Sequence, residues 1–251
     1  MKKIVGLVCE GPRDMDLLVS VIDHILPQAD ISYRYIQPDE TLSSPFLTGW
    51  KGVWNWCDQY GKSIDEYANG ISPKLDLLIV HLDGDVSRSN RESHCWCNAV
   101  ACADRGAVFP TRCDNTKCPI RLPCPHHEET VESYVNHLQA LLAGMFSEDR
   151  SLPILFFVPC DSTDAWIVAA LEDFPEPTDY ESIKNPWATI ICQGKYYHGV
   201  RINGAKKSRR SYDDLIAMMI GSWDKTVLRC KQAARFQEKI VHLFGNNDRG
   251  A

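Results

Sequence analysis

The sequence predicts an α/β protein with a doubly wound, mainly parallel β-sheet. Short apolar runs at 77–82 and 154–158 lack polar alternation, which is typical of strands buried on both faces of a parallel sheet. Segments with helical periodicity separate such runs along the chain, and this strand–helix alternation indicates the fold class. Ligands bind at the carboxyl ends of the strands in open sheets of this kind, so functional residues are expected there.

The individual elements follow from local pattern. Strands are expected at apolar or alternating runs, at residues 4–8, 31–36, 77–82, 154–158 and 190–192. Helices are expected where apolar residues recur at helical spacing, at 14–26, 54–68, 128–146, 212–220 and 223–243. A further helix is expected to follow Ser162 or Thr163, because either hydroxyl can cap a helix N-terminus.

Carboxylates mark the expected functional edge of the sheet. The run at 77–82 ends in Asp83-Gly84-Asp85, and strand alternation puts both aspartates on one side, together with His81. Glu10 follows the first strand in the same way. Carboxylates this close repel one another unless a proton or a cation lies between them, so a divalent metal is expected. An acidic turn is the alternative for Asp83 and Asp85, and His81 is expected in the core or beside the ligands rather than as a base.

The order of these motifs resembles the TOPRIM fold of topoisomerases, bacterial primases and OLD-type nucleases. The residues that carry the resemblance are EGPRD at 10–14 and DGD at 83–85. It implies that Glu10 acts in acid/base chemistry and that Asp83 and Asp85 bind Mg²⁺ (or Mn²⁺). Glu10 is expected at the same ion, because it too follows a strand that should lie beside theirs. Asp14 is a weaker member of the implied site.

A second stretch carries a related resemblance. Residues 159–169 read PCDSTDAWIVA, similar to the P-x-x-x-T-E-A-W-x-x-A stretch of a TOPRIM-like family found beside ATPases in bacterial defence and mobile-element loci. The glutamate of that family is Asp164 here, a shorter carboxylate with the same charge. The resemblance implies a catalytic role for Asp164 and a partner ATPase, and the sequence has no GxxxxGK[ST] loop of its own. The alternative for Asp164 is a charge that interacts favourably with a helix N-terminus.

Composition limits the localisation and the partners. Hydrophobic residues make up 44% and charged residues 24%, as in an ordinary globular protein. No apolar stretch approaches a membrane span and the N-terminus lacks a signal-peptide pattern, so a cytoplasmic protein without membrane contact is expected. The net charge of −6 argues against a globally basic nucleic-acid binder, although basic residues can still cluster locally.

Residues 87–127 differ in composition from the rest of the chain. They contain six cysteines and three histidines with little apolar periodicity. Cysteines in a reducing compartment are expected as thiols or metal ligands, and thiolate-bound Zn²⁺ would stabilise such an insertion. A loop with free thiols is the alternative. The expected zinc ligands are Cys113, Cys118 and Cys124, with His127 or one of Cys95, Cys97 and Cys102 as the fourth.

The C-terminal part carries the basic cluster of an otherwise acidic chain. Lys206, Lys207, Arg209 and Arg210 follow the last expected strand, with tyrosines nearby. Lysine and arginine neutralise phosphates and tyrosine stacks on unpaired bases, so we expect this segment to bind a nucleic-acid backbone without doing chemistry. A solvated loop is the alternative.

These features predict a TOPRIM-like core at 1–175, which includes the Cys/His-rich insertion at 87–127, and a basic loop with helices packed on that core at 176–251. The expected function is an Mg²⁺-dependent endonuclease, a phosphodiester hydrolase that cleaves DNA or RNA in bacterial antiphage defence together with a partner ATPase. Its catalytic carboxylates are Glu10, Asp83, Asp85 and Asp164. The alternatives are a non-catalytic, zinc-stabilised binding or sensor module and an enzyme that acts on small phosphorylated molecules.

Overall fold

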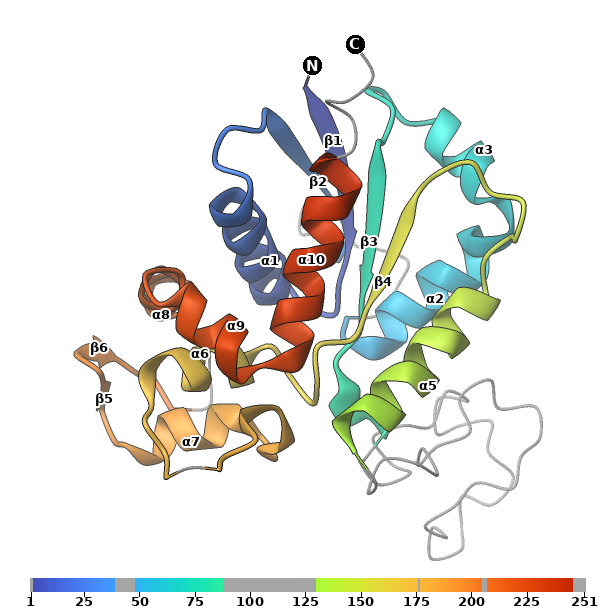
Figure 1. The fold of residues 1–251 in the computed structure, drawn as a ribbon. Helices are drawn as coiled ribbons and strands as arrows, with labels where there is room; N and C mark the ends of the chain where they lie inside the picture. Colours follow the sequence, from blue (N-terminus) through green and yellow to red (C-terminus); the bar gives the residue numbers. More distant parts are fainter. Residues whose placement is uncertain (1, 39–47, 88–129, 176, 205–206, 246–251) are drawn as a thin grey trace, which may run out of the picture.

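A four-stranded parallel sheet forms the centre of the molecule. The computed structural model describes residues 2–38, 48–87, 130–175, 177–204 and 207–245 (Figure 1). The sheet has the order β2-β1-β3-β4, and all three strand pairs are parallel. Its strands are β1 (Lys3–Val8), β2 (Ile31–Gln37), β3 (Leu77–His81) and β4 (Ile154–Phe157). The predicted α/β class with a parallel sheet is therefore confirmed, and the TOPRIM assignment stays a prediction.

The strand order reverses between β1 and β3. The chain passes from β1 to β2 on one side, then crosses back over β1 to form β3 and β4 on the other. Val5 pairs with Tyr33 of β2 and with Leu77 of β3, so β1 lies in the middle of this reversal. In open α/β sheets the crevice at such a reversal is where ligands bind.

Helices cover both faces of the sheet because the crossovers run in opposite directions. One face carries α1 (Pro12–Ile25) and α10 (Lys231–Gly245) (Figure 1). The other face carries α2 (Trp50–Tyr60), α3 (Ile64–Asn69), which follows a short 3₁₀ turn at Gly61–Ser63, and α5 (Val131–Gly144). Alternation along β1 separates the two cores, with Val5 and Leu7 facing α1 and Ile4 and Val8 facing α2.

The remaining elements form a C-terminal layer beside the carboxyl ends of the strands. It consists of α6 (Asp164–Leu171), the 3₁₀ turn η3 (Tyr180–Ser182), α7 (Pro186–Cys192), the hairpin β5 (Tyr196–Tyr197) and β6 (Val200–Arg201), α8 (Arg209–Ile220) and α9 (Trp223–Arg229). Residues 164–170 of α6 are all buried, because α7, α8 and α9 pack around this helix. At one contact the rings of Trp166 and Trp223 meet edge to face, with their centroids 5.6 Å apart.

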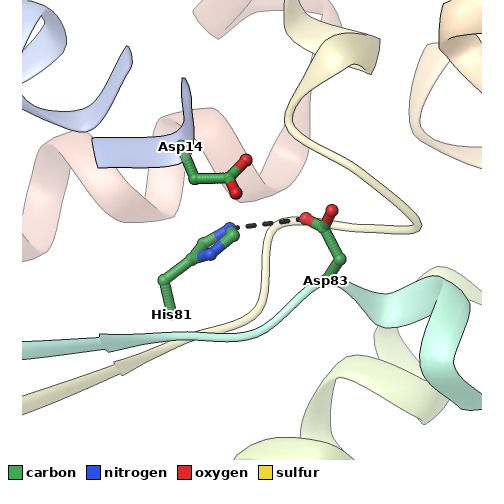
Figure 2. A group of neighbouring side chains, drawn as sticks. All are labelled: Asp14, His81 and Asp83. Atoms are coloured by element: carbon green, nitrogen blue, oxygen red, sulfur yellow. Dashed lines mark ion pairs between the residues drawn. The ribbon is translucent and has the colours of Figure 1, made fainter. Parts of the chain in front are cut away.

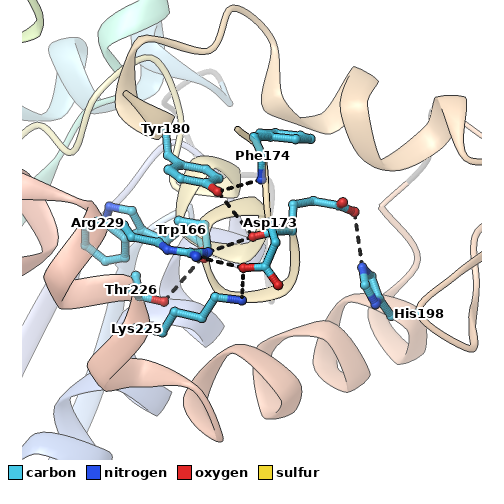
Figure 3. A network of polar contacts seen from close by, with 10 residues as sticks. Trp166, Asp173, Phe174, Tyr180, His198, Lys225, Thr226 and Arg229 are labelled. Carbon is cyan, nitrogen blue, oxygen red and sulfur yellow. Dashed lines mark hydrogen bonds and ion pairs between the residues drawn. The ribbon is translucent and has the colours of Figure 1, made fainter. Parts of the chain in front are cut away.

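Arg229 joins α9 to the C-terminal end of α6. Its guanidinium donates to the carbonyl oxygens of Ala169 and Glu172 at 3.0 and 2.7 Å, and to Asp173 Oδ1 at 2.7 Å (Figure 3). The same group lies over the ring of Tyr180. A cation there satisfies the last carbonyls of α6 and fixes this helix, which begins at the carboxylate edge of the sheet.

Several sequence predictions are wrong in detail. Residues 190–192 belong to helix α7 rather than to a strand, because Pro186 begins a helix in which the Asn185 side chain accepts a hydrogen bond from Ala188 N at 3.2 Å. The helix expected at 54–68 is interrupted by the 3₁₀ turn, and the one at 223–243 divides at Cys230, whose backbone is extended. Strand β4 is partly exposed on one face rather than buried on both. No helix in the described part of the chain is long and apolar enough to cross a bilayer.

Candidate functional site

Glu10 and Asp83 meet at the reversal of strand order. Glu10 follows β1 and Asp83 follows β3, and these strands are neighbours. The backbone N–H of Asp83 donates to Glu10 Oε1 at 2.8 Å. The structure therefore brings together two of the carboxylates that the sequence pointed to, and the third, Asp85, lies exposed two residues further on.

Asp14, His81 and Asp83 form the tightest group of potential metal ligands in the described residues. One ligand atom from each lies within 4.8 Å of the other two, and Figure 2 shows the side chains gathered around a common space. His81 ends β3 and is fully buried, with Nε2 3.4 Å from Asp83 Oδ1. Asp14 lies in the first turn of α1 and is 7% exposed. Sequence reasoning gave Asp14 a weaker role and did not count His81 among the ligands.

Hydrogen bonds hold the Asp14 carboxylate in place. Gly11 N donates to its Oδ2 at 3.1 Å and the Thr163 hydroxyl donates to its Oδ1 at 3.2 Å. Thr163 belongs to the stretch at 159–169, so this stretch contacts the carboxylate group through its threonine. Fixed carboxylates of this kind are what metal sites and acid/base catalysts require.

The charges of the site are predominantly negative. Burial, together with the charges of Asp83, Asp85 and Asp14, raises the pKa of Glu10 well above its usual range. Burial and Asp14 raise the pKa of Asp83 to about 6. For His81, burial lowers the pKa, but contact with Asp83 and the charge of Asp14 outweigh burial, so the pKa is raised. Surroundings that shift Glu10, Asp83 and His81 toward their protonated forms favour the arrival of a positive charge.

Asp164 lies at the start of α6 and binds a lysine. It is 2% exposed, and Lys207 Nζ lies 2.6 Å from its Oδ2. Tyr212 OH donates to Oδ1 at 2.9 Å, and the Ser162 hydroxyl donates to Oδ2 at 3.1 Å. Burial lowers the pKa of Lys207, but Asp164 more than compensates, so the pKa is raised and the lysine is charged. The Lys207 ammonium also lies 5.5 Å from the ring centroids of Trp187 and Tyr212.

The structure separates the basic residues that the sequence grouped. Lys207 lies at the carboxylates, whereas Arg209 and Arg210 are exposed at the start of α8. Lys206 lies outside the described residues. Lys207 therefore does not share the exposed position of Arg209 and Arg210, and binding of a nucleic-acid backbone by this segment stays a prediction.

A cleft of about 440 Å³ opens over these groups. Asp83, Asp85 and Asp164 line it together with Lys207. The other wall comes from residues 184–187, just before and within the start of α7. Sequence reasoning missed this wall because residues 184–187 match no motif and only the fold brings them to the sheet edge.

The predicted zinc ligands Cys113, Cys118, Cys124 and His127, and the alternatives Cys95, Cys97 and Cys102, lie outside the described residues, so the zinc site stays a prediction. The cysteines that the structure describes are all free thiols, at Cys9, Cys57, Cys160, Cys192 and Cys230.

The donor set at the sheet edge fits a divalent cation. Both ring nitrogens of His81 and Asp83 Oδ1 are buried without a hydrogen-bond partner among the described residues. Buried polar atoms are normally paired, so atoms of this kind indicate a group that they bind. Carboxylate oxygens and an imidazole nitrogen are common ligands of divalent metals.

The fold and this site define an α/β protein with a carboxylate-rich cleft at the reversal of its strand order. No protein-family model, curated protein or solved structure matches the chain.

Proposed function

We propose that this chain is a metal-dependent endonuclease, a phosphodiester hydrolase that acts on DNA or RNA. The observation that supports it best is the meeting of Glu10, Asp14 and Asp83 at the carboxyl ends of β1 and β3, beside an open cleft. Burial and the neighbouring carboxylates raise the pKa values of Glu10 and Asp83, so a cation bound beside these two groups would offset their negative charge. Carboxylates held together in this way are typical of sites that bind Mg²⁺ or Mn²⁺.

In this proposal Glu10, Asp83 and Asp85 hold the ion, which supplies charge stabilisation at the scissile phosphate and a more acidic water molecule. Burial and the neighbouring carboxylates raise the pKa of Glu10, which suits this residue to act as a general acid or base. Lys207 presents an ammonium group in the same cleft, where it can bind a phosphate oxygen. Asp164 and Tyr212 position that ammonium group.

The approach of a polyanion to an acidic site needs cations nearby. Lys184 lines the cleft and is exposed, and Arg209 and Arg210 are exposed at the start of α8. We propose that these side chains contact the nucleic-acid backbone outside the reacting centre, where each contact releases counterions. The TOPRIM-like resemblance adds a partner ATPase and a role in antiphage defence, which we keep as part of the proposal.

The test is cleavage of supercoiled plasmid, single-stranded DNA and tRNA by the full chain with Mg²⁺ or Mn²⁺. We expect at least one substrate to be cut, and Asp83→Asn to reduce the rate by about 100-fold or more, because replacing even a supporting residue of a metal site costs 10–100-fold. Asp58→Asn, an exposed aspartate of α2, is the matched control and should cut as wild type does.

Equal cleavage by Asp83→Asn and wild type would assign the activity to a contaminant and overturn the proposal. Tight binding of nucleic acid without cleavage, under either metal, would favour the alternative of a non-catalytic binding module.

A further inference from the structure

His81 is a buried imidazole that the protein leaves without a hydrogen bond. The side chain is 0% exposed, and neither Nδ1 nor Nε2 has a hydrogen-bond partner among the described residues. Its contact with Asp83 Oδ1 is 3.4 Å long, which is beyond the range of a normal N–H···O bond. A buried imidazole usually donates from one nitrogen and accepts at the other, so this one lacks what its chemistry requires.

The surroundings of His81 supply oxygen ligands at a suitable spacing. Two ligands of one ion at about 2.1 Å lie about 3 Å apart when adjacent and about 4.2 Å apart when opposite. The 3.4 Å between His81 Nε2 and Asp83 Oδ1 fits the adjacent arrangement. One ligand atom from each of Asp14, His81 and Asp83 lies within 4.8 Å of the other two. A small inward movement of the side chains completes a three-ligand site.

The remaining contacts of Asp14 support a ligand role. Gly11 N and the Thr163 hydroxyl each donate to one of its oxygens, and each oxygen keeps a lone pair for another partner. Hydrogen bonds from outside a metal site orient its ligands in this way. Figure 2 shows the Asp14 carboxylate and Asp83 next to the His81 ring, with Asp14 coming from α1 and the other two from the end of β3 and the residues just after it.

We infer that Asp14, His81 and Asp83 form a mixed nitrogen–oxygen site for a first-row transition-metal ion, in preference to Mg²⁺. Mg²⁺ takes oxygen ligands and keeps its water, whereas the ions from Mn²⁺ to Zn²⁺ also accept imidazole. The inference rests on the proposed hydrolase for its biological role. It adds the identity of the metal, and it places Asp14 and His81 around the ion with Asp83, in place of Glu10 and Asp85. It makes His81 a ligand rather than a core residue.

The competing explanation is an ion triad in which a protonated His81 neutralises Asp14 and Asp83. That arrangement would place an N–H of the ring at hydrogen-bond distance from each carboxylate. The structure does not have these hydrogen bonds, because His81 Nε2 lies 3.4 Å from Asp83 Oδ1 and His81 Nδ1 has no partner among the described residues.

The test uses Mn²⁺ alone as the probe, because its electron spin reports on its ligands and thiolates bind it poorly. Electron spin-echo spectroscopy of the full wild-type chain with Mn²⁺ should show coupling to one imidazole nitrogen, which labelling of histidine with ¹⁵N identifies. Mn²⁺ should bind about 10-fold or more tightly than Mg²⁺ in competition. His81→Gln should abolish the nitrogen coupling and lower Mn²⁺ affinity by about 10-fold or more, since a direct ligand matters at least as much as the groups that orient it.

His24→Gln is the matched control, because His24 is exposed in the last turn of the same helix that carries Asp14. It should keep the coupling and the affinity. The wild-type spectrum decides the question even if His81→Gln fails to fold. Mn²⁺ bound without nitrogen coupling would overturn the inference and leave the hydrolase proposal standing. Nitrogen-coupled Mn²⁺ in a protein that cuts no nucleic acid would support the inference and overturn the proposed function.

Discussion

At the scale of single residues, Lys207 shows how position decides chemistry. In the sequence it is one of four basic residues within 206–210, and nothing distinguishes it from the other three. In the fold its ammonium group lies 2.6 Å from the buried Asp164 and lines the cleft, whereas Arg210 is exposed on α8. An ammonium group held in a partly buried site interacts with a phosphate far more strongly than one in free solvent.

We predict that Lys207→Met and Arg210→Met affect different kinetic constants. Lys207→Met should lower kcat by about 100-fold, the effect of removing one fixed stabilising group at a reacting centre. Arg210→Met should leave kcat unchanged, weaken binding and flatten its dependence on salt by about one unit of slope. Steady-state cleavage across a salt series measures both. A Lys207→Met enzyme with normal kcat and only a salt-dependent rise in KM would contradict this prediction. It would show that Lys207 only binds the nucleic-acid backbone, as the sequence predicted.

At the scale of elements, Glu181 connects η3 to the start of α10. Its carboxylate is 3% exposed and accepts hydrogen bonds from Gln232 N at 2.9 and 3.0 Å and from Trp166 Nε1 at 3.4 Å. Gln232 lies in the first turn of α10, so Glu181 caps that helix from a distant part of the chain. Burial outweighs these hydrogen bonds and raises the pKa of Glu181 to about 7.

We predict that Glu181 makes the fold less stable as pH rises from about 4.5 to 7. Between these values the unfolded chain has lost the proton and the folded chain keeps it, so rising pH favours unfolding. The loss is on the order of 2–3 kcal/mol, from 1.36 kcal/mol per pKa unit. Glu181→Gln should remove this part of the pH dependence. Urea unfolding of both proteins at pH 5 and pH 8 measures the difference, with the exposed Glu238→Gln on α10 as control. A gap between wild type and Glu181→Gln that does not change with pH would contradict the prediction.

The elements also show where local sequence is sufficient. Runs without polar residues predicted β3, and helical periodicity predicted α5, because both signals come from burial of neighbouring positions. The break at Cys230 was missed because α10 takes its cap from Glu181, about fifty residues earlier. The 190–192 run was misread because Ile190 and Ile191 suit a strand by propensity, while Trp187 and Ile190 are buried in α7, which packs on α6.

At the scale of the whole molecule, some parts of the site could be predicted from the sequence and others could not. Glu10 and Asp83 could be placed together from sequence, because both follow strands that a parallel sheet makes neighbours. Lys207 and the cleft wall at 184–187 could not, because their position depends on how the C-terminal layer packs. The carboxylates can be recognised from the short sequence around each of them. The groups on the opposite side of the cleft can be recognised only from the tertiary structure.

Packing of the C-terminal layer has a consequence for the division of the chain at residue 175. Nearly half of the buried residues in the core between α1 and the sheet come from 176–251. Among them Phe236 and Ile240 of α10 cover one face of the sheet, and Tyr212 and Leu215 of α8 pack in the same core. Full burial of one such side chain contributes about 1.5–3 kcal/mol, so the loss of about ten of them matches or exceeds the roughly 5–15 kcal/mol that typically stabilises a whole domain.

We therefore predict that residues 1–175 alone do not fold, although they contain all four strands of the main sheet. The fragment should bind a hydrophobic dye and unfold without a cooperative transition, because one face of its sheet keeps α1 but loses α10. A chain that ends at residue 245 keeps every described element and is the matched control, which should unfold cooperatively like the full chain. Calorimetry and dye binding on the three proteins provide the measurement. A sharp, reversible transition in 1–175 would show that the strands, α1 and the other face of helices form an independent domain, and that α8 to α10 are an addition to it.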